Sequence, residues 1–353
     1  MFKEYYNVIG VMSGTSLDGV DLAYIKFNNS GRWSFTICAS ETISYPTEWL
    51  TKLKNAIHFS PAELDELNVS YTKLLASLIS EFISNHNLTA IDAICSHGHT
   101  ILHQPHNGFT LQIGNLPILR ELVPHTIVCD FRVQDVQLGG QGAPLVPIGD
   151  ELLFSEYDYC LNLGGFSNVS FHENGHRVAF DISPVNTVLN FYANDLGFPY
   201  DDGGGIAKSG TIHHELLQKL NDLAFYKASY PKSLGMEFVN EEIFPLIESF
   251  AIESKDKLCT FVEHIAMQIA MICSKPHSKL FITGGGAYNA FLIARLQHYL
   301  PTTALIIPDD QTIQFKEALI FGFLGVLRLR NEINVLSSVT GATKNHSSGV
   351  IFK

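Results

Sequence analysis

Two glycine-containing turns, each flanked by apolar strand-like segments, place the strongest constraint on the fold of this chain. The first turn lies between apolar positions at 8–11 and 20–27, and the second lies between 159–163 and 169–171. A strand, a tight turn and a returning strand are typical of a β-hairpin. Because this pattern begins each half of the chain, we expect a duplicated α/β core with a cleft between the halves.

The remaining elements alternate between strands and helices. Ser60, followed by Pro61 and Glu63, is typical of a helix N-terminus, and leucines at helical spacing extend this helix to about Asn85. Further strands are expected at 33–44, 91–96, 126–131, 178–182, 279–283 and 304–307, and further helices at 187–196, 259–273, 289–299 and 315–328. This alternation indicates an α/β protein.

The length of 353 residues is sufficient for two domains with separate cores. Segment 139–147 contains three glycines and two prolines, which is typical of a rigid loop at a domain boundary. We therefore predict an N-terminal domain over 1–135 and a C-terminal domain over 136–329. The tail from about 330 to 353 is expected to be able to pack back on the first domain.

Composition excludes several classes of partner. Hydrophobic residues make up 46% of the chain and charged residues 16%, as in a folded globular protein. The 35 acidic and 23 basic residues give a formal charge of −12, which repels nucleic acid and acidic membranes at long range. Neither a membrane-spanning apolar run nor a signal peptide is recognisable. The six scattered cysteines predict free thiols, a cytoplasmic location and no zinc site.

The first turn carries groups that suit a phosphate and a metal ion. Its glycines allow backbone N–H groups to approach an anion, and its hydroxyl side chains can donate hydrogen bonds. Asp18 and Asp21 are suitable for a hydrated magnesium ion, which prefers oxygen ligands. An ordinary hairpin turn remains the alternative, because Gly, Ser and Asp are common in turns. A Walker loop is excluded, since no Lys follows the second glycine.

Two later positions are candidates for the same chemistry. The three glycines at 284–286 follow a strand and precede a helix, where backbone can approach a nucleotide at the helix N-terminus. Asp181 stands at the predicted end of a strand, where it is either a general base or a turn-capping residue. Both walls of the predicted cleft would thus contribute to nucleotide binding.

Two other polar clusters have weaker interpretations. The histidines at 97, 99, 103 and 106 lack carboxylate or Cys partners at zinc spacing, so contacts to a sugar or phosphate are favoured over a metal. Segment 201–205 (Asp-Asp-Gly-Gly-Gly) does not match an EF-hand, so a flexible loop is favoured there.

Taken together, these motifs resemble the anhydro-N-acetylmuramic acid kinases, which are sugar kinases of the actin, hexokinase and heat-shock chaperone superfamily. The resemblance extends from Val8 to the C-terminus. The matching segments are 12–21, Asp130-Phe131-Arg132 with Asp135, 139–147, 162–165, 284–289, 316–318 and 340–342.

The resemblance implies a two-domain, duplicated actin-like ATPase fold, which is ribonuclease H-like, with an interdomain cleft. It implies an ATP- and Mg²⁺-dependent enzyme of peptidoglycan recycling, expected as a homodimer, that opens a 1,6-anhydro sugar and phosphorylates O6. Asp181 corresponds to the base that activates water, and Asp18 and Asp21 would hold Mg²⁺ through water. The implied ATP-binding residues are Gly14, Thr15, Ser16, Leu17, Asp18, Gly19, Val20, Asp21, Gly164, Gly165, Gly284, Gly285, Gly286 and Asn289. The implied sugar-binding residues are His97, Arg132, Gln141, Asn186 and Glu317.

The chain departs from the family pattern beside the candidate base. The usual Asp-Thr-Gly-Pro-Gly-Asn is replaced by Asp181-Ile182-Ser183-Pro184-Val185-Asn186, so two glycines are lost. Segment 232–237 lacks a Thr and an Arg of the usual pattern, and His99 replaces a Gln. A related kinase with another sugar and a binding protein without turnover therefore remain alternatives.

Overall fold

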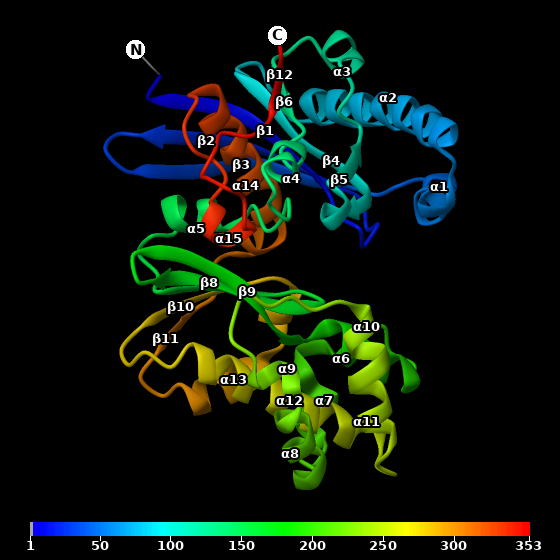
Figure 1. Cartoon of the computed structure of the whole chain (residues 1–353), viewed down its shortest axis with the longest axis vertical. Coiled ribbons are helices and arrows are strands. Elements are labelled where there is room, and N and C mark those ends of the chain that lie inside the picture. The colour runs from blue at the N-terminus through cyan, green and yellow to red at the C-terminus, as the bar shows by residue number, and fades with distance from the viewer. Residues whose placement is uncertain (1–2) are drawn as a thin grey trace. The chain divides into compact units, whose positions relative to one another are not determined.

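The computed structural model describes residues 3–353 and contains two compact units (Figure 1). Of the described residues, unit 1 comprises 3–153 and 315–353, and unit 2 comprises 154–314. The division expected from sequence places 136–153 and 315–329 with the second domain, whereas their contacts group them with the first. The reason is packing, because the helices within these two segments lie against the first sheet and against each other.

Unit 1 is built on a seven-stranded sheet with the order β12-β6-β4-β1-β2-β3, in which β5 also pairs with β4. The hairpin β1–β2 and its neighbour β3 are antiparallel, whereas β4 and β6 run parallel to β1. The C-terminal strand β12 pairs with β6, so the tail does return to this unit. The strands are β1 (Tyr5–Ser13), β2 (Val20–Asn29), β3 (Trp33–Ile43), β4 (Ala93–Gln104), β5 (Phe109–Ile113), β6 (Ile127–Cys129) and β12 (Val350–Phe352).

Helices cover both faces of this sheet. Ile9 and Val11 of β1 share a buried cluster with α2, whereas Val8 and Gly10, which point to the other face, contact α14. A capping box between Ser60 and Glu63 begins α2, as the sequence predicts. The helices of unit 1 are α1 (Thr47–Asn55), α2 (Pro61–Asn85), α3 (Ile118–Leu122), α4 (Val133–Gln137), α5 (Pro147–Leu153) and α15 (Ser337–Thr340), with 3₁₀ turns at Ala56–His58 and Pro105–Asn107. Helix α14 (Asp310–Leu329) begins in unit 2 and continues into unit 1.

Glycines allow α14 to lie directly on the sheet. A Cβ on Gly10 would overlap the carbonyl oxygen of Ala318, and a Cβ on Gly325 would overlap the Cys95 sulfur. The helix backbone and the central strands therefore approach more closely than side chains would permit. This contact fixes the part of α14 that carries Lys316 and Glu317.

Unit 2 contains a five-stranded sheet with the order β11-β10-β7-β8-β9. Here too the first three strands form an antiparallel meander, and the last two run parallel to the first. Order and direction match β6-β4-β1-β2-β3 of unit 1, which confirms the predicted duplicated, ribonuclease H-like fold of actin-like ATPases. The strands are β7 (Tyr159–Leu163), β8 (Phe166–Glu173), β9 (His176–Pro184), β10 (Lys279–Thr283) and β11 (Ala304–Ile306).

The core of unit 2 surrounds α12, whose Phe261, Ile265 and Ile269 are fully buried. Helices α6, α7, α8 and α13 pack against it. The helices are α6 (Asn186–Asp195), α7 (Gly205–Ser209), α8 (His214–Asp222), α9 (Ala224–Lys227), α10 (Met236–Phe238), α11 (Phe244–Glu248), α12 (Ser254–Ile272) and α13 (Ala290–Tyr299), with a π turn at Val239–Ile243 and 3₁₀ turns η3 (Asp202–Gly204) and η5 (Gly285–Tyr288).

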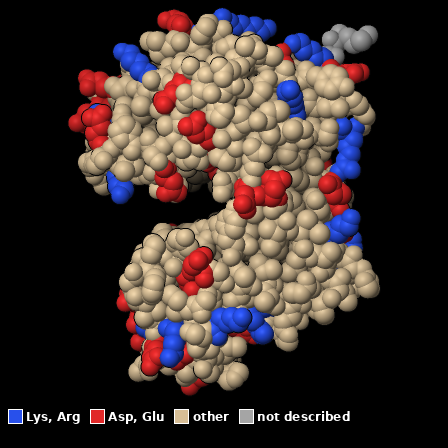
Figure 2. Space-filling model, turned by 180° about the vertical axis from the view of Figure 1, so that it is seen from behind, with Lys and Arg blue, Asp and Glu red and all other residues tan. Residues whose placement is uncertain are grey.

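Charged side chains are spread over the surface drawn in Figure 2, and the cysteines are unpaired. Charged side chains of both signs are interspersed on the face drawn in Figure 2. Within residues 3–353, no helix combines the length and the apolar character needed to cross a membrane. All six cysteines are free, and five of them are buried, which confirms the predicted free thiols.

Candidate functional site

The turn between β1 and β2 combines a constrained backbone with exposed polar side chains. Leu17 has a φ of +64°, which a branched residue rarely adopts, and its N–H donates to the Gly14 carbonyl (3.3 Å). Gly19 lies so close to β3 that a Cβ there would be 2.6 Å from the Ile43 carbonyl oxygen. Thr15 and Ser16 are exposed. Strained backbone of this kind is concentrated at functional loops.

Asp21 is the better held of the two candidate metal-binding carboxylates. Its Oδ1 accepts a hydrogen bond from Thr42 Oγ1 (2.6 Å), whereas Asp18 is exposed. Burial raises the pKa of Asp21, the Thr42 hydrogen bond opposes this shift, and the charge of Asp18 adds to it. These oxygen donors fit a magnesium ion that keeps much of its water. Within the described residues, no cluster of three or more His, Cys, Asp or Glu side chains forms a metal site.

Arg132 and His97 form a directly bonded pair in unit 1. Arg132 Nε donates to His97 Nε2 (2.8 Å), and His97 Nδ1 lies 2.9 Å from the Gly98 carbonyl. Because Nε2 accepts, the proton of the neutral ring is on Nδ1 and is donated to Gly98. Burial and the Arg132 charge lower the pKa of His97. Arg132, which retains some exposure, has its pKa lowered to about 10 by desolvation and therefore stays charged at neutral pH.

Carboxylates from distant parts of unit 1 gather near Arg132. Glu317 and Asp135 both oppose the lowering of the Arg132 pKa. Loss of hydration raises the pKa of Glu317, although its side chain keeps accessible surface; Arg132 lowers this pKa and Asp21 raises it. The unit thus brings Asp21, Arg132 and Glu317 into one electrostatic environment. Gln141 lies in the glycine-rich segment 139–147, and its side chain is exposed.

The remaining histidines of the cluster contact different partners. His99 Nδ1 lies 2.7 Å from Ser13 Oγ, which in turn lies 2.5 Å from the Tyr45 hydroxyl. Burial lowers the pKa of His99 to about 4, so this ring is neutral. His103 instead contacts Thr110 Oγ1 (3.0 Å). Tyr45 was not among the residues that the sequence singled out, because no local motif marks its contact with Ser13.

In unit 2 the two glycine turns pack against each other. A Cβ on Gly284 would lie 2.7 Å from the carbonyl carbon of Leu163, and Gly284 has a φ of +83°. The Asn186 side chain donates to the Leu163 carbonyl (3.2 Å), and the N–H groups at the start of α6 donate to the Gly164 and Gly165 carbonyls. Gly164, Gly165 and Gly284–Gly286 are therefore brought together around the N-terminus of α6.

A pocket of about 430 Å³ lies beside these turns, wholly within unit 2. Asparagine, aspartate, glycine and tyrosine make up its lining together with one leucine, and its volume suits a small molecule. Asn289, predicted from sequence, lines the pocket, and its side chain caps α13 by accepting from the Leu292 N–H (2.9 Å). The lining residues are Asn186, Leu189, Asn190, Tyr200, Asp201, Asp202, Gly203, Gly285, Tyr288 and Asn289.

Some pocket residues were not predicted. Asn190 and Tyr200 lie outside the motifs, and only their polarity and, for Tyr200, an exposed aromatic ring mark them. The flexible loop expected at 201–205 is instead η3 and the start of α7, because buried Asp201 accepts from the Ile206 and Ala207 N–H groups.

Asp181 lies inside β9 rather than at its end, since this strand continues to Pro184. The pairing register with β8 shifts next to Asp181, and such bulges redirect side chains near functional sites. The Leu234 N–H donates to Asp181 Oδ2 (2.8 Å). Burial raises the pKa of Asp181, and the Leu234 hydrogen bond partly opposes this shift. A carboxylate with a raised pKa is suited to accept a proton.

The residues that replace the family's usual Thr and Gly point into the core of unit 2. Ile182 and Val185 are 2% and 0% exposed and belong to its hydrophobic cluster. Ser183 is also buried and bonds to Ser167 through its N–H and its hydroxyl. Val185 has a negative φ of −131°, so it lies outside the left-handed region that favours glycine. The added side chains are therefore absorbed by packing, away from the Asp181 carboxylate.

The two sheets, which match in strand order and direction, define a protein of the actin-like ATPase fold class. The family model for anhydro-N-acetylmuramic acid kinase matches residues 6–353. The chain belongs to the anhydro-N-acetylmuramic acid kinase family.

Curated relatives cover nearly the full length of the chain. A protein named anhydro-N-acetylmuramic acid kinase from Pseudomonas fluorescens (strain Pf0-1) is 36% identical over 98% of both chains. Proteins with the same name from Pseudomonas syringae pv. syringae (strain B728a) and Vibrio cholerae serotype O1 are each 34% identical; the former covers 98% of both chains, and the latter covers 99% of this chain and 98% of its own. Among solved structures, component A of the (R)-2-hydroxyglutaryl-CoA dehydratase of Acidaminococcus fermentans covers 93% of this chain, at 14% identity and a TM-score of 0.48.

Proposed function

We propose that this enzyme uses ATP to open 1,6-anhydro-N-acetylmuramic acid hydrolytically and to phosphorylate O6, giving N-acetylmuramic acid 6-phosphate. Family membership and the name shared by the full-length relatives support this substrate. The observation that carries the reaction type is Asp181, a half-buried carboxylate with a raised pKa held by one backbone N–H. A cytoplasmic role in peptidoglycan recycling, as a homodimer, is proposed from family resemblance.

The proposed chemistry has one proton transfer and one phosphoryl transfer. Asp181 accepts a proton from a water molecule while the oxygen of that water forms a bond to C1 of the sugar. The bond between C1 and the bridging oxygen breaks, and this oxygen, still attached to C6, takes the γ-phosphoryl group while ADP leaves. Arg132, which stays protonated, and the polar groups around it orient the sugar through charge-assisted hydrogen bonds.

Each unit contains groups that we propose for nucleotide binding. The pocket of unit 2, with its tyrosines and asparagines, suits a nucleoside, and the neighbouring glycine turns suit its phosphates. The Gly14–Asp21 turn of unit 1 is proposed, from family resemblance, as a further phosphate-binding segment. Asp18 and Asp21 would hold Mg²⁺ through water, and the ion would neutralise phosphate charge.

The reaction is tested by incubating the protein with ATP, Mg²⁺ and the anhydro sugar and measuring the sugar product by mass. In ¹⁸O-labelled water, the product should carry one labelled oxygen at C1. A product without the label contradicts hydrolytic opening and favours simple phosphorylation. Nucleotide binding without any product contradicts catalysis altogether.

The role of Asp181 is tested with Asp181→Asn, which keeps the shape of the side chain but removes the base. Loss of a general base lowers turnover by about 10²–10⁴-fold, while nucleotide affinity should be unchanged. A matched control is Asp222→Asn, because Asp222 is an exposed carboxylate of the same unit that pairs with Lys227. Undiminished turnover of the Asp181 variant contradicts the assignment.

A further inference from the structure

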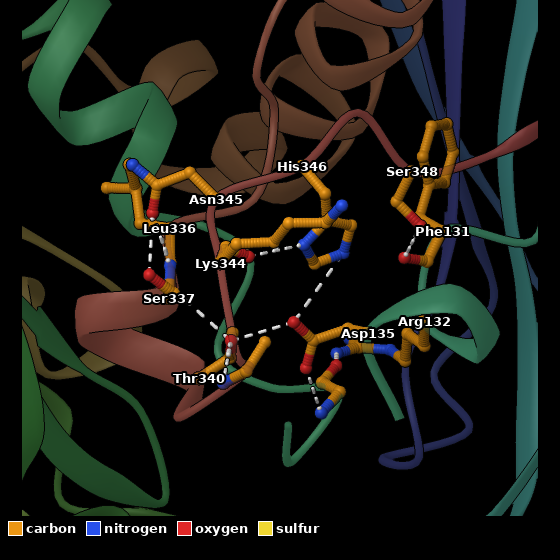
Figure 3. A network of polar contacts seen from close by, with 12 residues as sticks. Phe131, Arg132, Asp135, Leu336, Ser337, Thr340, Lys344, Asn345, His346 and Ser348 are labelled. Carbon is orange, nitrogen blue, oxygen red and sulfur yellow. Dashed lines mark hydrogen bonds and ion pairs between the residues drawn. The ribbon is translucent and has the colours of Figure 1, made fainter. Parts of the chain in front are cut away.

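Buried Asp135 connects the C-terminal segment of the chain to the loop that supports Arg132 (Figure 3). Its Oδ1 accepts a hydrogen bond from Thr340 Oγ1 (2.7 Å), and its Oδ2 accepts one from the Gly142 N–H (2.7 Å). His346 Nε2 lies 3.6 Å from Oδ1. Both carboxylate oxygens are therefore used by residues that are distant from each other in the sequence.

The loop is shaped to enclose this carboxylate. A Cβ on Gly140 would overlap Asp135 Oδ2, and Gly142 has a φ of +68°, so both positions require glycine. The Gly140 N–H also donates to the Asp135 carbonyl (2.9 Å). Because the backbone closes around Asp135, a displacement of this side chain must move the loop.

The same loop contains one of the five sugar-binding candidates, Gln141, and is bonded to another, Arg132. Arg132 Nη1 donates to the Gly142 carbonyl (2.6 Å), so Gly142 is bonded to Asp135 through its N–H and to Arg132 through its carbonyl. The Gln141 N–H donates to the Thr340 carbonyl (2.8 Å). Thr340 thus contacts the loop at two points, one through its hydroxyl and Asp135 and one through its backbone.

We propose that Thr340 is a positioning residue for the sugar, acting through Asp135 to hold Arg132 and Gln141 in place. This inference rests on the proposed function, in which Arg132 and Gln141 bind the sugar. Thr340 itself does not contact substrate. Its hydroxyl fixes the carboxylate, and the carboxylate fixes the loop.

The test compares Thr340→Val and Thr340→Ala, which lack the hydroxyl, with Thr340→Ser, which keeps it. Steady-state kinetics are measured with the anhydro sugar and with ATP as the varied substrate. Without the hydroxyl, KM for the sugar should rise on the order of tenfold, because a hydrogen bond to a buried charge is lost. KM for ATP should change less than about twofold, and Thr340→Ser should restore the wild-type values.

The readouts separate positioning from stability and from the proposed function. A purely structural role lowers the melting temperature and the active fraction but leaves KM for the sugar unchanged, and that result overturns the inference. Equal rises in KM for sugar and ATP also overturn it. If the wild-type protein makes no phosphorylated sugar, the proposed function itself fails. Thr340→Ala covers the case in which the valine methyl group prevents folding.

Discussion

Substitution of Gly325 tests the packing of α14 on the sheet of unit 1. In Gly325→Ala the new Cβ would overlap the Cys95 sulfur and lie 2.7 Å from the Cys95 Cβ. Ordinary contact begins at 3.4 Å, so helix and strand must separate by at least roughly 0.7 Å at this point. Overpacking of this kind costs about 1–3 kcal/mol, and the better helix propensity of Ala offsets up to about 1 kcal/mol.

Cys95→Ala provides the second half of a double-mutant cycle. Alone it removes a buried sulfur, which costs about 1 kcal/mol. Combined with Gly325→Ala, it removes the overlap between the new Cβ and the Cys95 sulfur. The double variant should therefore be more stable, by about 0.5–3 kcal/mol, than the sum of the two single-variant changes in the free energy of unfolding predicts. Gly205→Ala is a control, because its Cβ meets no atom within 4 Å and its φ is −63°.

Tryptophan fluorescence during urea unfolding suits this experiment. The chain has two tryptophans, Trp33 and Trp49, and both belong to unit 1. Trp33 also contacts Phe323 of α14 with ring centroids 5.0 Å apart, so the signal reports the packing in question. Strict additivity of the two substitutions, or a Gly325→Ala variant as stable as the wild type, would refute the reasoning.

Two further predictions concern the base and a helix terminus. Burial raises the pKa of Asp181, and the base acts only when it is ionised. As pH is lowered, kcat/KM should therefore begin to fall at a pH above the ordinary Asp pKa of about 3.9. A pH–rate profile that stays flat down to about pH 4 would contradict this. The same shift favours the protonated form in the folded state, so the contribution of Asp181 to stability is fully present below its unfolded pKa and is lost as pH rises from there through its raised folded-state pKa. Ser60→Ala removes the capping box with Glu63 and should lower the free energy of unfolding by about 0.5–2 kcal/mol, measured by the same fluorescence assay, whereas Ser60→Asp should retain most of it.

Local signals explain which elements were predictable. Alternating apolar residues indicated the hairpins of both units, and the capping residues at Ser60 and Glu63 placed the start of α2 correctly. The helix predicted to begin at Phe315 starts five residues earlier, at Asp310. Phe315 has φ and ψ of −109° and 15°, so the predicted start coincides with an interruption inside α14.

Contacts between distant segments were not predictable from one sequence. Asp181 was a candidate base on its position in a motif, but its hydrogen bond comes from Leu234, 53 residues later. Asp135 likewise bonds to Thr340, 205 residues away. No local pattern encodes such pairs, because each depends on which strands and helices become neighbours after folding.

The discontinuity of unit 1 has a consequence for synthesis on the ribosome. Residues 154–314 emerge before 315–353, so all of unit 2 is available while the first sheet still lacks α14 and β12. Until those segments appear, the edge of β6 has no partner on that side and the apolar face around Val8 and Cys95 is uncovered. Such surfaces associate readily with other nascent chains. Residues 315–353 therefore decide when the earlier segment of unit 1 is protected from aggregation.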